Sequence, residues 1–482
     1  MTGRKVIGVD SSTQSCKVVL CAADTGEVLA TGRADHPDST EVDPAAWWAA
    51  FEHASDGLLD QADAISVAGQ QHGMVALDDT GAVVRNALLW NDLRSAPDAD
   101  DLVAELSAPE WASATGSVPG ASFTISKLRW LARCEPDNAA RTAAVLLPHD
   151  WLTGQLAATS NTGTPAPIAN AITDAGDASG TGYFSPATRT HLPELAERAL
   201  GHRPALPRIA EPAEQVGTTR SGAAIGPGTG DNMGAALGLG AEPGDAIVSL
   251  GTSGTVFGVS DGPTADPTGA VAGFADATGR FLPLVCTLNA ARVLGAAASM
   301  LGVDLAGLEL LALQAAPGAS GVVLLPYLDG ERTPNLPAAS GSLHGLTRSN
   351  MTPANIARAA VEGMLCGLVD GVDALTAARG NAPSRLLLIG GASASRAVRA
   401  VLPALFGGQV RLPAAAEYVA LGAARQAAWV LAAAGGAAAP ADVLPQWTVP
   451  ATDLREPTDA ELAGGVEVRR RYAEVRVAAH GA

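Results

Sequence analysis

Short apolar runs separated by polar turns open the chain. Residues 6–10 form an apolar run that ends on Asp10, and a Ser/Thr-rich turn at 11–15 separates it from a second run at 18–21. An Asp-Thr-Gly turn at 24–26 then precedes a third run at 28–30. Turns of this composition join antiparallel strands. The pattern therefore predicts a three-stranded antiparallel meander with a tight polar turn after its first strand.

The next stretch changes to a helical pattern and then back to a strand. Residues 44–59 predict a helix, and Pro44 suits its first turn, where no backbone donor is needed. Residues 65–69 predict another strand, and the Asp-Thr-Gly sequence at 79–81 predicts a further turn.

The opening pattern returns halfway along the chain. An apolar run at 246–250 leads into the small polar turn 251–254 and a second apolar run at 255–259. Two polar hairpins at the starts of two halves favour a duplicated architecture that holds a ligand between the halves, although strand–turn–strand units are common enough to recur by coincidence. The Ala-Glu-Pro-Gly sequence at 241–244 suits a boundary. We therefore expect domains at 1–241 and 242–482.

Two later segments carry a strand–turn–helix pattern and a long apolar stretch. Residues 386–389 predict a strand that runs through glycines into a helix at 395–405, whose first amides suit a ligand. The stretch 427–441 is mostly alanine and is interrupted by two glycines. It predicts a packed helix and its exit, not a membrane span.

Length, composition and charge narrow the class of protein. The chain has 482 residues, which favours two or more domains, and 47% of them are hydrophobic, which is enough for packed cores. Only 4% are aromatic, so we expect helices that pack closely through small side chains. The formal net charge of −18 argues against a nucleic acid or an anionic membrane as partner. Phosphate must then be held by backbone amides, a metal ion or local Lys and Arg.

The cysteines and the N-terminus indicate a cytoplasmic protein. The five cysteines are odd in number, widely spaced and never in a C-x-x-C pair, so a reducing compartment is favoured over a disulfide framework. The first residues lead directly into the predicted strand at 6–10, which leaves no room for a signal peptide.

Neither common nucleotide fingerprint is present. The chain has no G-x-x-x-x-G-K-[ST] and no G-x-G-x-x-G sequence, so a phosphate ligand needs another cradle. The turn at 251–254 and its counterpart at 11–13 have the small residues of an anion-binding turn. Asp10, at the end of the first strand, suits Mg²⁺ ligation or equally an ordinary strand-end turn.

Asp231 is the candidate for proton transfer. It is flanked by glycines that allow close approach, and residues 233–239 predict a helix directly after it. An Asp at this position is more often an N-cap, and composition alone favours that interpretation.

Two polar clusters interrupt apolar surroundings. Residues 69–73 read Gly-Gln-Gln-His-Gly, and residues 89–94 combine Trp, Asn, Asp and Arg. Such mixtures suit a polyol, whose carbons stack and whose hydroxyls need donors and acceptors. A loop with a structural Asp–Arg pair explains either cluster taken alone.

Taken in order, these segments resemble the FGGY carbohydrate kinase family, which includes xylulose, glycerol and gluconate kinases. The resemblance covers nearly the whole chain. It rests on GQQHG (69–73), LLWNDLR (88–94), LLPHDWL (146–152), GTGDNMGAALG (228–238), SLGTSG (249–254), LLPYLDGERTPNLPAASG (324–341) and the stretch 341–362.

The resemblance implies an α/β fold of two actin-like (ribonuclease H-like) ATPase domains that close over a cleft. Each domain would hold a mixed five-stranded sheet with helices on both sides. The domain at 1–241 would bind the sugar and the domain at 242–482 the nucleotide. The implied reaction is phosphorylation of D-xylulose by ATP with Mg²⁺. Ribulose, gluconate or a sugar alcohol stay open as substrates, as does a sugar-binding regulator without catalysis.

The roles that the resemblance implies follow the matching motifs. Asp231 would be the general base and Asp10 the Mg²⁺ residue. The sugar would lie against Gln71, His72, Asn232, Trp90 and Asp92, the phosphates against Thr13, Gly251 and Thr252, and the adenosine against Gly390, Gly391 and Asn289.

This chain departs from the family pattern at two positions. Ser12 stands where many relatives have glycine in the first hairpin, and Ala392 stands where many have a third consecutive glycine. Both bear on nucleotide affinity and not on the reaction. Alanine-rich helices in the second half suit a homodimer surface or internal core, and we favour the core.

Overall fold

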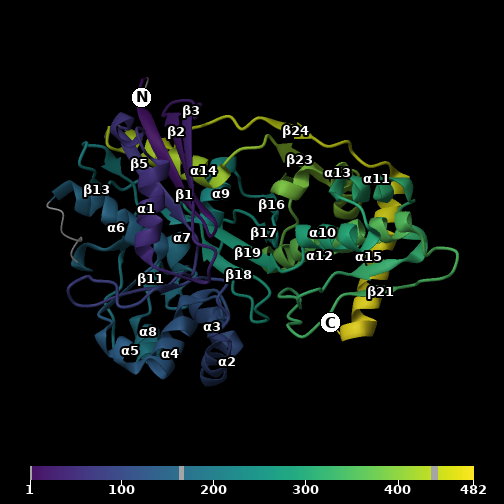
Figure 1. Cartoon of the computed structure of the whole chain (residues 1–482), viewed down its shortest axis with the longest axis horizontal. Coiled ribbons are helices and arrows are strands. Elements are labelled where there is room, and N and C mark those ends of the chain that lie inside the picture. Colours follow the sequence, from purple (N-terminus) through teal and green to yellow (C-terminus); the bar gives the residue numbers. More distant parts are fainter. Residues whose placement is uncertain (1–2, 162–167, 436–442, 482) are drawn as a thin grey trace. The chain divides into compact units, whose positions relative to one another are not determined.

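The chain folds into two compact units. The computed structural model describes residues 3–161, 168–435 and 443–481 (Figure 1). The chain passes from unit 1 into unit 2 and returns to unit 1 twice. Unit 1 contains Met1–Ala241, Val259–Leu282 and Ala416–Val449, and unit 2 contains Glu242–Gly258, Pro283–Ala415 and Pro450–Ala482.

A mixed seven-stranded sheet forms the centre of unit 1. The predicted meander is confirmed: β1 pairs antiparallel with β2, and β2 pairs antiparallel with β3. On its other side β1 pairs parallel with β5, which pairs parallel with β14 and β15. The strands are β1 (Lys5–Ser11), β2 (Ser15–Ala22), β3 (Val28–Asp35), β5 (Ala64–Gly69), β13 (Gly217–Thr218), β14 (Ala224–Ile225) and β15 (Thr229–Gly230).

The second large sheet repeats this arrangement. Its central strand β16 pairs antiparallel with β17 and parallel with β22, and β22 pairs parallel with β23. The order β19-β17-β16-β22-β23 matches β3-β2-β1-β5-β14, so the predicted duplication is confirmed. The family resemblance implies five strands in each sheet. The two sheets share an arrangement of five strands, and short edge strands extend each sheet to seven. The strands are β16 (Asp245–Leu250), β17 (Gly254–Phe257), β18 (Ala272–Ala275), β19 (Phe281–Thr287), β22 (Arg385–Ile389), β23 (Gln409–Pro413) and β24 (Ala451–Asp453).

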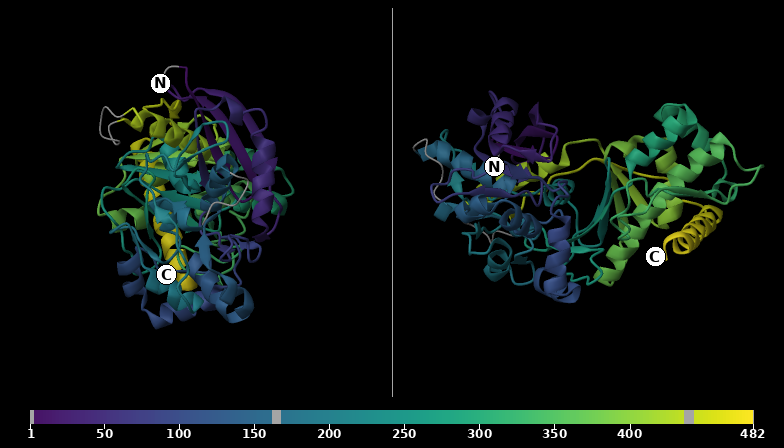
Figure 2. Two further views of the ribbon diagram at one scale, coloured as in Figure 1. Left: turned by 90° about the vertical axis from the view of Figure 1, so that its left-hand side faces the viewer. Right: turned by 60° about the horizontal axis from the view of Figure 1, so that its bottom comes forward.

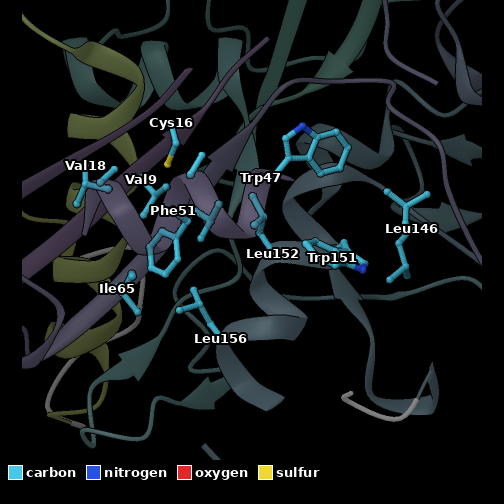
Figure 3. Close-up of a cluster of buried hydrophobic side chains, with 14 of the residues drawn as sticks. Val9, Cys16, Val18, Trp47, Phe51, Ile65, Leu146, Trp151, Leu152 and Leu156 are labelled. Atoms are coloured by element: carbon cyan, nitrogen blue, oxygen red, sulfur yellow. The ribbon is translucent and has the colours of Figure 1, made fainter. Parts of the chain in front are cut away.

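Helices cover both faces of the first sheet because alternate strand residues are apolar on each face. Ile7 and Val9 of β1 face α1 (Pro44–Ala54) and α6 (Pro148–Asn161), where Trp47 and Trp151 lie edge to face (Figure 3). Val6, one position out of phase, faces the buried alanines of α14 (Tyr418–Ala433). From Val6 to Ser11, the residues of β1 are thereby withdrawn from water.

The predicted close packing through small side chains is confirmed at α14. A Cβ at Gly8 would lie 1.9 Å from the carbonyl oxygen of Ala420, so only glycine admits α14 at this distance. A Cβ at Gly238 in α9 (Asp231–Leu239) would lie 2.0 Å from the carbonyl oxygen of Tyr418. The alanine-rich helix is therefore core of unit 1, as favoured.

The remaining helices each belong to one of the two units. In unit 2 the C-terminal helix α15 (Asp459–His480), yellow in Figures 1 and 2, packs against α13 and α12. The other helices of unit 2 are α10 (Ala291–Leu301), α11 (Leu305–Gln314), α12 (Pro353–Arg379) and α13 (Arg396–Phe406). Those of unit 1 are α2 (Ala96–Glu105), α3 (Ala108–Thr115), α4 (Thr124–Cys134), α5 (Pro136–Arg141), α7 (Ala175–Ala178) and α8 (Pro193–Leu200).

Short strand pairs lie outside the large sheets. They are β4 (Glu41–Val42) with β7 (Ala87–Leu88), β6 (Val75–Leu77) with β8 (Ala144–Leu146), β9 (Ile172–Thr173) with β12 (Arg208–Ile209), β10 (Phe184–Ser185) with β11 (Thr190–His191), and β20 (Val323–Leu325) with β21 (Ser342–His344).

Three predicted elements differ at their ends. The helix predicted for 44–59 ends at Ala54, and a short 3₁₀ turn, Leu59–Gln61, follows. The helix predicted to leave the 386–389 strand is preceded by the 3₁₀ turn Gly391–Ala394, and Ser395 caps it as its side chain accepts from Val398 N. In the stretch 427–441, α14 ends at Ala433, and residues 436–442 lie outside the described residues.

Within the described ranges, no single helix is long and apolar enough to cross a membrane. Only α10 and α11 together, bent by 86° at their junction, meet the length and composition test.

Candidate active site

Strand register brings Asp10 and Asp231 to the same edge of the first sheet. Asp10 lies opposite Ala68 of β5, and Ala68 lies opposite Thr229 of β15. Asp231 follows β15 directly as the first residue of α9. The two carboxylates thus emerge from strands separated by β5 alone, a spacing of about 10 Å between their backbones.

Asp231 is not the N-cap that composition favoured. Gly230 occupies that position in extended conformation, and Asp231 begins the helix. Its Oδ1 accepts from the backbone N of Asn232 at 2.8 Å and from Asn232 Nδ2 at 2.9 Å. The carboxylate is thereby fixed at the positive end of α9, where an anion is favoured.

Gln71 joins this pair from the loop after β5. Its Oε1 accepts from Asn232 Nδ2 at 3.0 Å, while its buried Nε2 has no hydrogen-bond partner among the described residues. A buried donor without a partner is costly unless a ligand satisfies it. Gln71, Asn232 and Asp231 therefore present an amide donor beside a carboxylate, which suits vicinal hydroxyls.

His72 is held in a left-handed backbone conformation. It has φ 66°, which non-glycine residues rarely adopt. Its carbonyl accepts from Lys127 Nζ and from Thr124 Oγ1, both at 3.2 Å. Its Nδ1 lies 2.6 Å from the carbonyl oxygen of Gly180, which requires that Nδ1 carry a proton. The ring makes tilted contacts with Phe123 and Phe274, at centroid distances of 4.9 Å and 5.9 Å.

The Trp90–Asp92 segment is already bonded within unit 1. Trp90 Nε1 donates to Thr13 Oγ1 at 2.8 Å, which links the predicted sugar cluster to the first hairpin. Asp92 accepts from Thr40 Oγ1 at 2.8 Å and from Arg94 Nε at 2.8 Å. Both carboxylate oxygens of Asp92 are thus engaged by protein groups.

The carboxylate of Asp10, at the first hairpin, lies close to a hydroxyl group and an ammonium group. Ser12 Oγ donates to Asp10 Oδ1, and Lys17 Nζ lies 3.7 Å from Oδ2 and 2.7 Å from Glu417 Oε2. Burial raises the pKa of Asp10 to about 6, although the bond from Ser12 and the charge of Lys17 act in the opposite direction. Ser12 therefore contacts the residue predicted to hold the metal.

The donor set fits a magnesium ion carried by a nucleotide. Among the described residues, no group of three or more His, Cys, Asp or Glu side chains is arranged to hold a metal ion. Mg²⁺ bound with a nucleotide takes most of its ligands from phosphate and water and needs one or two carboxylates. The buried Asp10 carboxylate, close enough to Asp231 to raise its pKa, fits that requirement.

Asp231 has the proton affinity of a general base. Burial, together with the negative charges of Asp10 and Asp177, raises the pKa of Asp231 to about 7, against hydrogen bonds from the backbone. A base with pKa near the working pH combines ionisation with useful basicity.

In unit 2 the predicted phosphate turn is exposed and anchored to α10. The carbonyl oxygen of Gly251 accepts from Ala291 N at 3.1 Å, and that of Thr252 accepts from Arg292 Nε at 3.4 Å. Arg292 also pairs with Asp329 at 2.7 Å. The exposed turn thus lies beside a guanidinium.

Gly390 and Gly391 differ in their surroundings. Gly390 has φ 91°, and a Cβ there would lie 2.6 Å from the backbone of Leu250 at the end of β16. A Cβ at Gly391 would meet nothing within 4 Å. The exposed backbone of Gly391 therefore leaves room for a flat ligand, and Gly390 brings that backbone against β16.

Asn289 is engaged within unit 2. It is 2% exposed, and its Nδ2 donates to the carbonyl oxygen of Gly330 at 2.6 Å and to Glu331 Oε2 at 3.0 Å. Its Oδ1 accepts from Leu328 N at 3.1 Å. These bonds hold the loop 328–331 in place, so Asn289 would act on a nucleotide by positioning that loop.

Sequence reasoning missed a buried ionisable cluster in unit 1. His149 lies 2.6 Å from Asp177, 3.2 Å from Asp150 and 3.8 Å from Asp174. His149 and Asp150 belong to the LLPHDWL segment, which received no chemical role, and the other two residues were not singled out. The signal was a His-Asp pair in the first turn of a predicted apolar segment, LLPHDWL.

Comparisons with known proteins agree over most of the chain. A family model described as the FGGY family of carbohydrate kinases, N-terminal domain, matches residues 5–240. The C-terminal domain model of the same family matches residues 246–431.

Individual relatives extend this likeness. A xylulose kinase from Streptomyces coelicolor is 45% identical over 479 residues, which cover 95% of each chain. The crystal structure of a xylulose kinase from Bifidobacterium adolescentis has a TM-score of 0.88 and 42% identity, over 98% of this chain and 99% of that one. A gluconate kinase structure from Lactobacillus acidophilus also has a TM-score of 0.88, at 22% identity over 98% of each chain, and shares the fold.

Proposed function

This chain belongs to the FGGY family of carbohydrate kinases, and from that premise we propose that it phosphorylates D-xylulose with ATP. The relatives named xylulose kinase that align over nearly its full length support this substrate. The products are D-xylulose 5-phosphate and ADP.

Asp231 is the proposed general base. Its carboxylate accepts the proton of the terminal hydroxyl as the hydroxyl oxygen bonds to the γ-phosphorus, and the bond from that phosphorus to the β–γ bridging oxygen breaks. The transition state of such transfers is loose, so positioning and charge stabilisation supply most of the rate. The observation that carries this role is the raised pKa of Asp231, about 7, at the fixed start of α9.

The sugar is proposed to lie against unit 1 residues around that carboxylate. The unpartnered Nε2 of Gln71 supplies a donor, and Asn232 orients both Gln71 and Asp231. His72, Trp90 and Asp92 are proposed to complete the sugar site, with Asp92 acting through its bond to Arg94. Domain 1–241 is accordingly the proposed sugar domain.

The nucleotide is proposed to bind mainly through domain 242–482. Gly251, Thr252 and Thr13 face the phosphates, and Gly390 and Gly391 face the adenosine, with Asn289 supporting the loop beside them. Mg²⁺ bound at Asp10 would neutralise phosphate charge. Asp10 would hold the ion, and Ser12 keeps the Asp10 carboxylate oriented.

The proposed partners are the sugar and ATP, and the proposed location is the cytoplasm. Cys16, Cys21, Cys134 and Cys366 are free thiols, which supports a reducing compartment. The negative net charge supports the absence of nucleic acid and anionic membrane as partners. A homodimer is a further proposal that light scattering tests.

The test is release of ADP by the purified protein with ATP, Mg²⁺ and a panel of sugars. The proposal predicts strong stimulation by D-xylulose and weaker stimulation by ribulose, gluconate and sugar alcohols. Preference for another member of the panel would overturn the substrate, and no stimulation by any sugar would favour a binding protein without catalysis.

A further inference from the structure

Four buried ionisable groups lie beside the proposed sugar site. His149 and Asp150 start α6, Asp174 caps α7, and Asp177 lies within α7. Their exposures are 0%, 3%, 4% and 0%, so none of them is solvated by bulk water. The proposed mechanism makes no use of them beyond the influence of Asp177 on Asp231.

The imidazole of His149 is the centre of this cluster. His149 Nδ1 lies 2.6 Å from Asp177 Oδ2, and Nε2 lies 3.2 Å from Asp150 Oδ1. Asp174 Oδ1 is 3.8 Å from the same Nε2. These carboxylates offset the burial of a charged imidazole, because an unpaired buried charge costs several kcal/mol.

The same cluster contacts both segments that carry the proposed sugar residues. Thr229 Oγ1, two residues before Asp231, donates to Asp174 Oδ2 at 2.7 Å. A Cβ at Gly228 would lie 2.5 Å from His149 Cδ2, and a Cβ at Gly69 would lie 3.0 Å from His149 Cβ. His149 therefore packs against the end of β5, which precedes Gln71, and against the segment that enters α9.

The surroundings favour the charged form of His149. Burial opposes the charge, but Asp150, Asp177 and Asp174 outweigh it and raise the pKa of His149 to about 9. Burial raises the pKa of Asp177 to about 6, against its bond to His149, so the pair is ionised at neutral pH. Tyr183 also faces the cluster, and burial with the charges of Asp150 and Asp177 raises its pKa.

We propose that the buried His149–Asp177 pair is a positioning unit for Asp231: His149 packs against the segments that lead to Gln71 and Asp231, its cation balances the carboxylates beside α9, and the Asp177 anion acts on the Asp231 carboxylate. The proposal rests on the proposed function and extends it to residues that do not touch the substrate. The charged groups that act on Asp231 are Asp10 from β1 and Asp177 from α7, while Lys17 and Glu417 act on Asp10.

Asp177→Asn tests the anion. Asparagine keeps an acceptor for His149 Nδ1 but removes the negative charge, so the pKa of Asp231 falls. The acidic limb of the profile of kcat/KM against pH moves to lower pH by roughly 0.5 to 1 unit. Asp98→Asn is the control, since it removes a carboxylate of unit 1 that is equally buried but pairs with Arg133 outside the cluster, and leaves the limb in place. The proposal is overturned if the acidic limb lies at the same pH in the wild type and in Asp177→Asn.

His149→Gln and His149→Lys test the cation. Glutamine removes the charge and is expected to lower kcat by roughly 10-fold or more, while lysine keeps a positive charge and restores most of it. A role in packing alone would make both variants equally poor, since neither side chain reproduces the imidazole. Equal losses in the two variants contradict the proposal.

An NMR titration of the wild type tests the proposal without any variant, so it can be used even if a variant does not fold. The imidazole ¹³C resonance of His149, assigned in the wild type, is titrated by NMR. The proposal predicts an imidazolium at pH 7, and a neutral ring at that pH overturns it. Wild-type ADP release with D-xylulose tests the proposed function separately, so the two failures are distinguishable.

Discussion

Asn232 Nδ2 donates to Gln71 Oε1 across 3.0 Å, although 161 residues separate the two along the chain. The bond joins the first turn of α9 to the loop after β5, and it leaves Gln71 Nε2 as a donor without a protein partner. The same Asn232 amide also donates to Asp231 Oδ1, so the proposed base and the proposed sugar donor are oriented by one side chain.

Gln71→Leu should weaken sugar binding. Loss of the Nε2 donor and of the bond to Asn232 removes about 1 to 3 kcal/mol of interaction, so KM for D-xylulose rises roughly 5- to 150-fold while KM for ATP changes little. Initial rates at varied sugar and varied ATP measure both constants. Gln61→Leu is the control, because the exposed Gln61 amide already has protein partners: its Nε2 donates to the carbonyl oxygen of Gly57 at 2.7 Å and its Oε1 accepts from Lys5 Nζ at 3.1 Å. An equal rise in KM for D-xylulose in the two variants would contradict this role.

The strands were predictable from the sequence because their apolar residues alternate between two covered faces. Ile7 and Val9 face one helical layer and Val6 the other, and the turns after β1 and β16 carry small polar residues. These local signals established the hairpins and their duplication. The strand count was less predictable, since β13, β14 and β15 contain two residues each.

The long-range contacts of the site were not predictable from local patterns. Asp10 and Asp231 approach because β15 pairs with β5, and a two-residue strand leaves no periodic signal. His149 and Asp177 lie on different helices, and their pairing depends on how α6 and α7 fold against each other. The family resemblance supplied Asp231, whereas the structure alone revealed the ionisable cluster beside it.

The pH dependence of the reaction should reflect Asp231. Only the ionised carboxylate accepts a proton, so kcat/KM for D-xylulose should rise with pH and level off above about pH 7, where the raised pKa of Asp231 lies. Rates from about pH 5 to about pH 9 with saturating MgATP measure this limb. A limb near the ordinary aspartate pKa of 3.8 would contradict the assigned environment.

Ser12→Ala should raise the Mg²⁺ concentration that the reaction needs at mildly acidic pH. Ser12 donates to Asp10 and lowers its pKa, so loss of the hydroxyl raises that pKa above about 6. The carboxylate is then more protonated near pH 6, and more Mg²⁺ is needed for half-maximal rate, while the difference shrinks at pH 8. Ser11→Ala is the matched control, because Ser11 Oγ is buried without a hydrogen-bond partner. Titrations of the initial rate against Mg²⁺ concentration, for both variants at the two pH values, test this prediction.

Gly390→Ala should harm nucleotide binding more than Gly391→Ala. The first variant places a Cβ 2.6 Å from the Leu250 backbone at a φ of 91°, so the turn must shift. It is expected to cost about 1 to 3 kcal/mol in stability and to raise KM for ATP. The second variant adds a methyl group to open space and should keep its melting temperature. Thermal melts and ATP titrations test the pair, and equal melting temperatures would contradict the packing described for Gly390.

The central claim is that Asp231 accepts the proton of the sugar hydroxyl. Its most direct test is kcat for ADP release by Asp231→Ala with D-xylulose and MgATP, beside the wild type and with a thermal melt of each. We predict a fall of roughly 10²- to 10⁴-fold in kcat with a folded protein, which is the contribution of a positioned base. Turnover close to that of the wild type would contradict the claim.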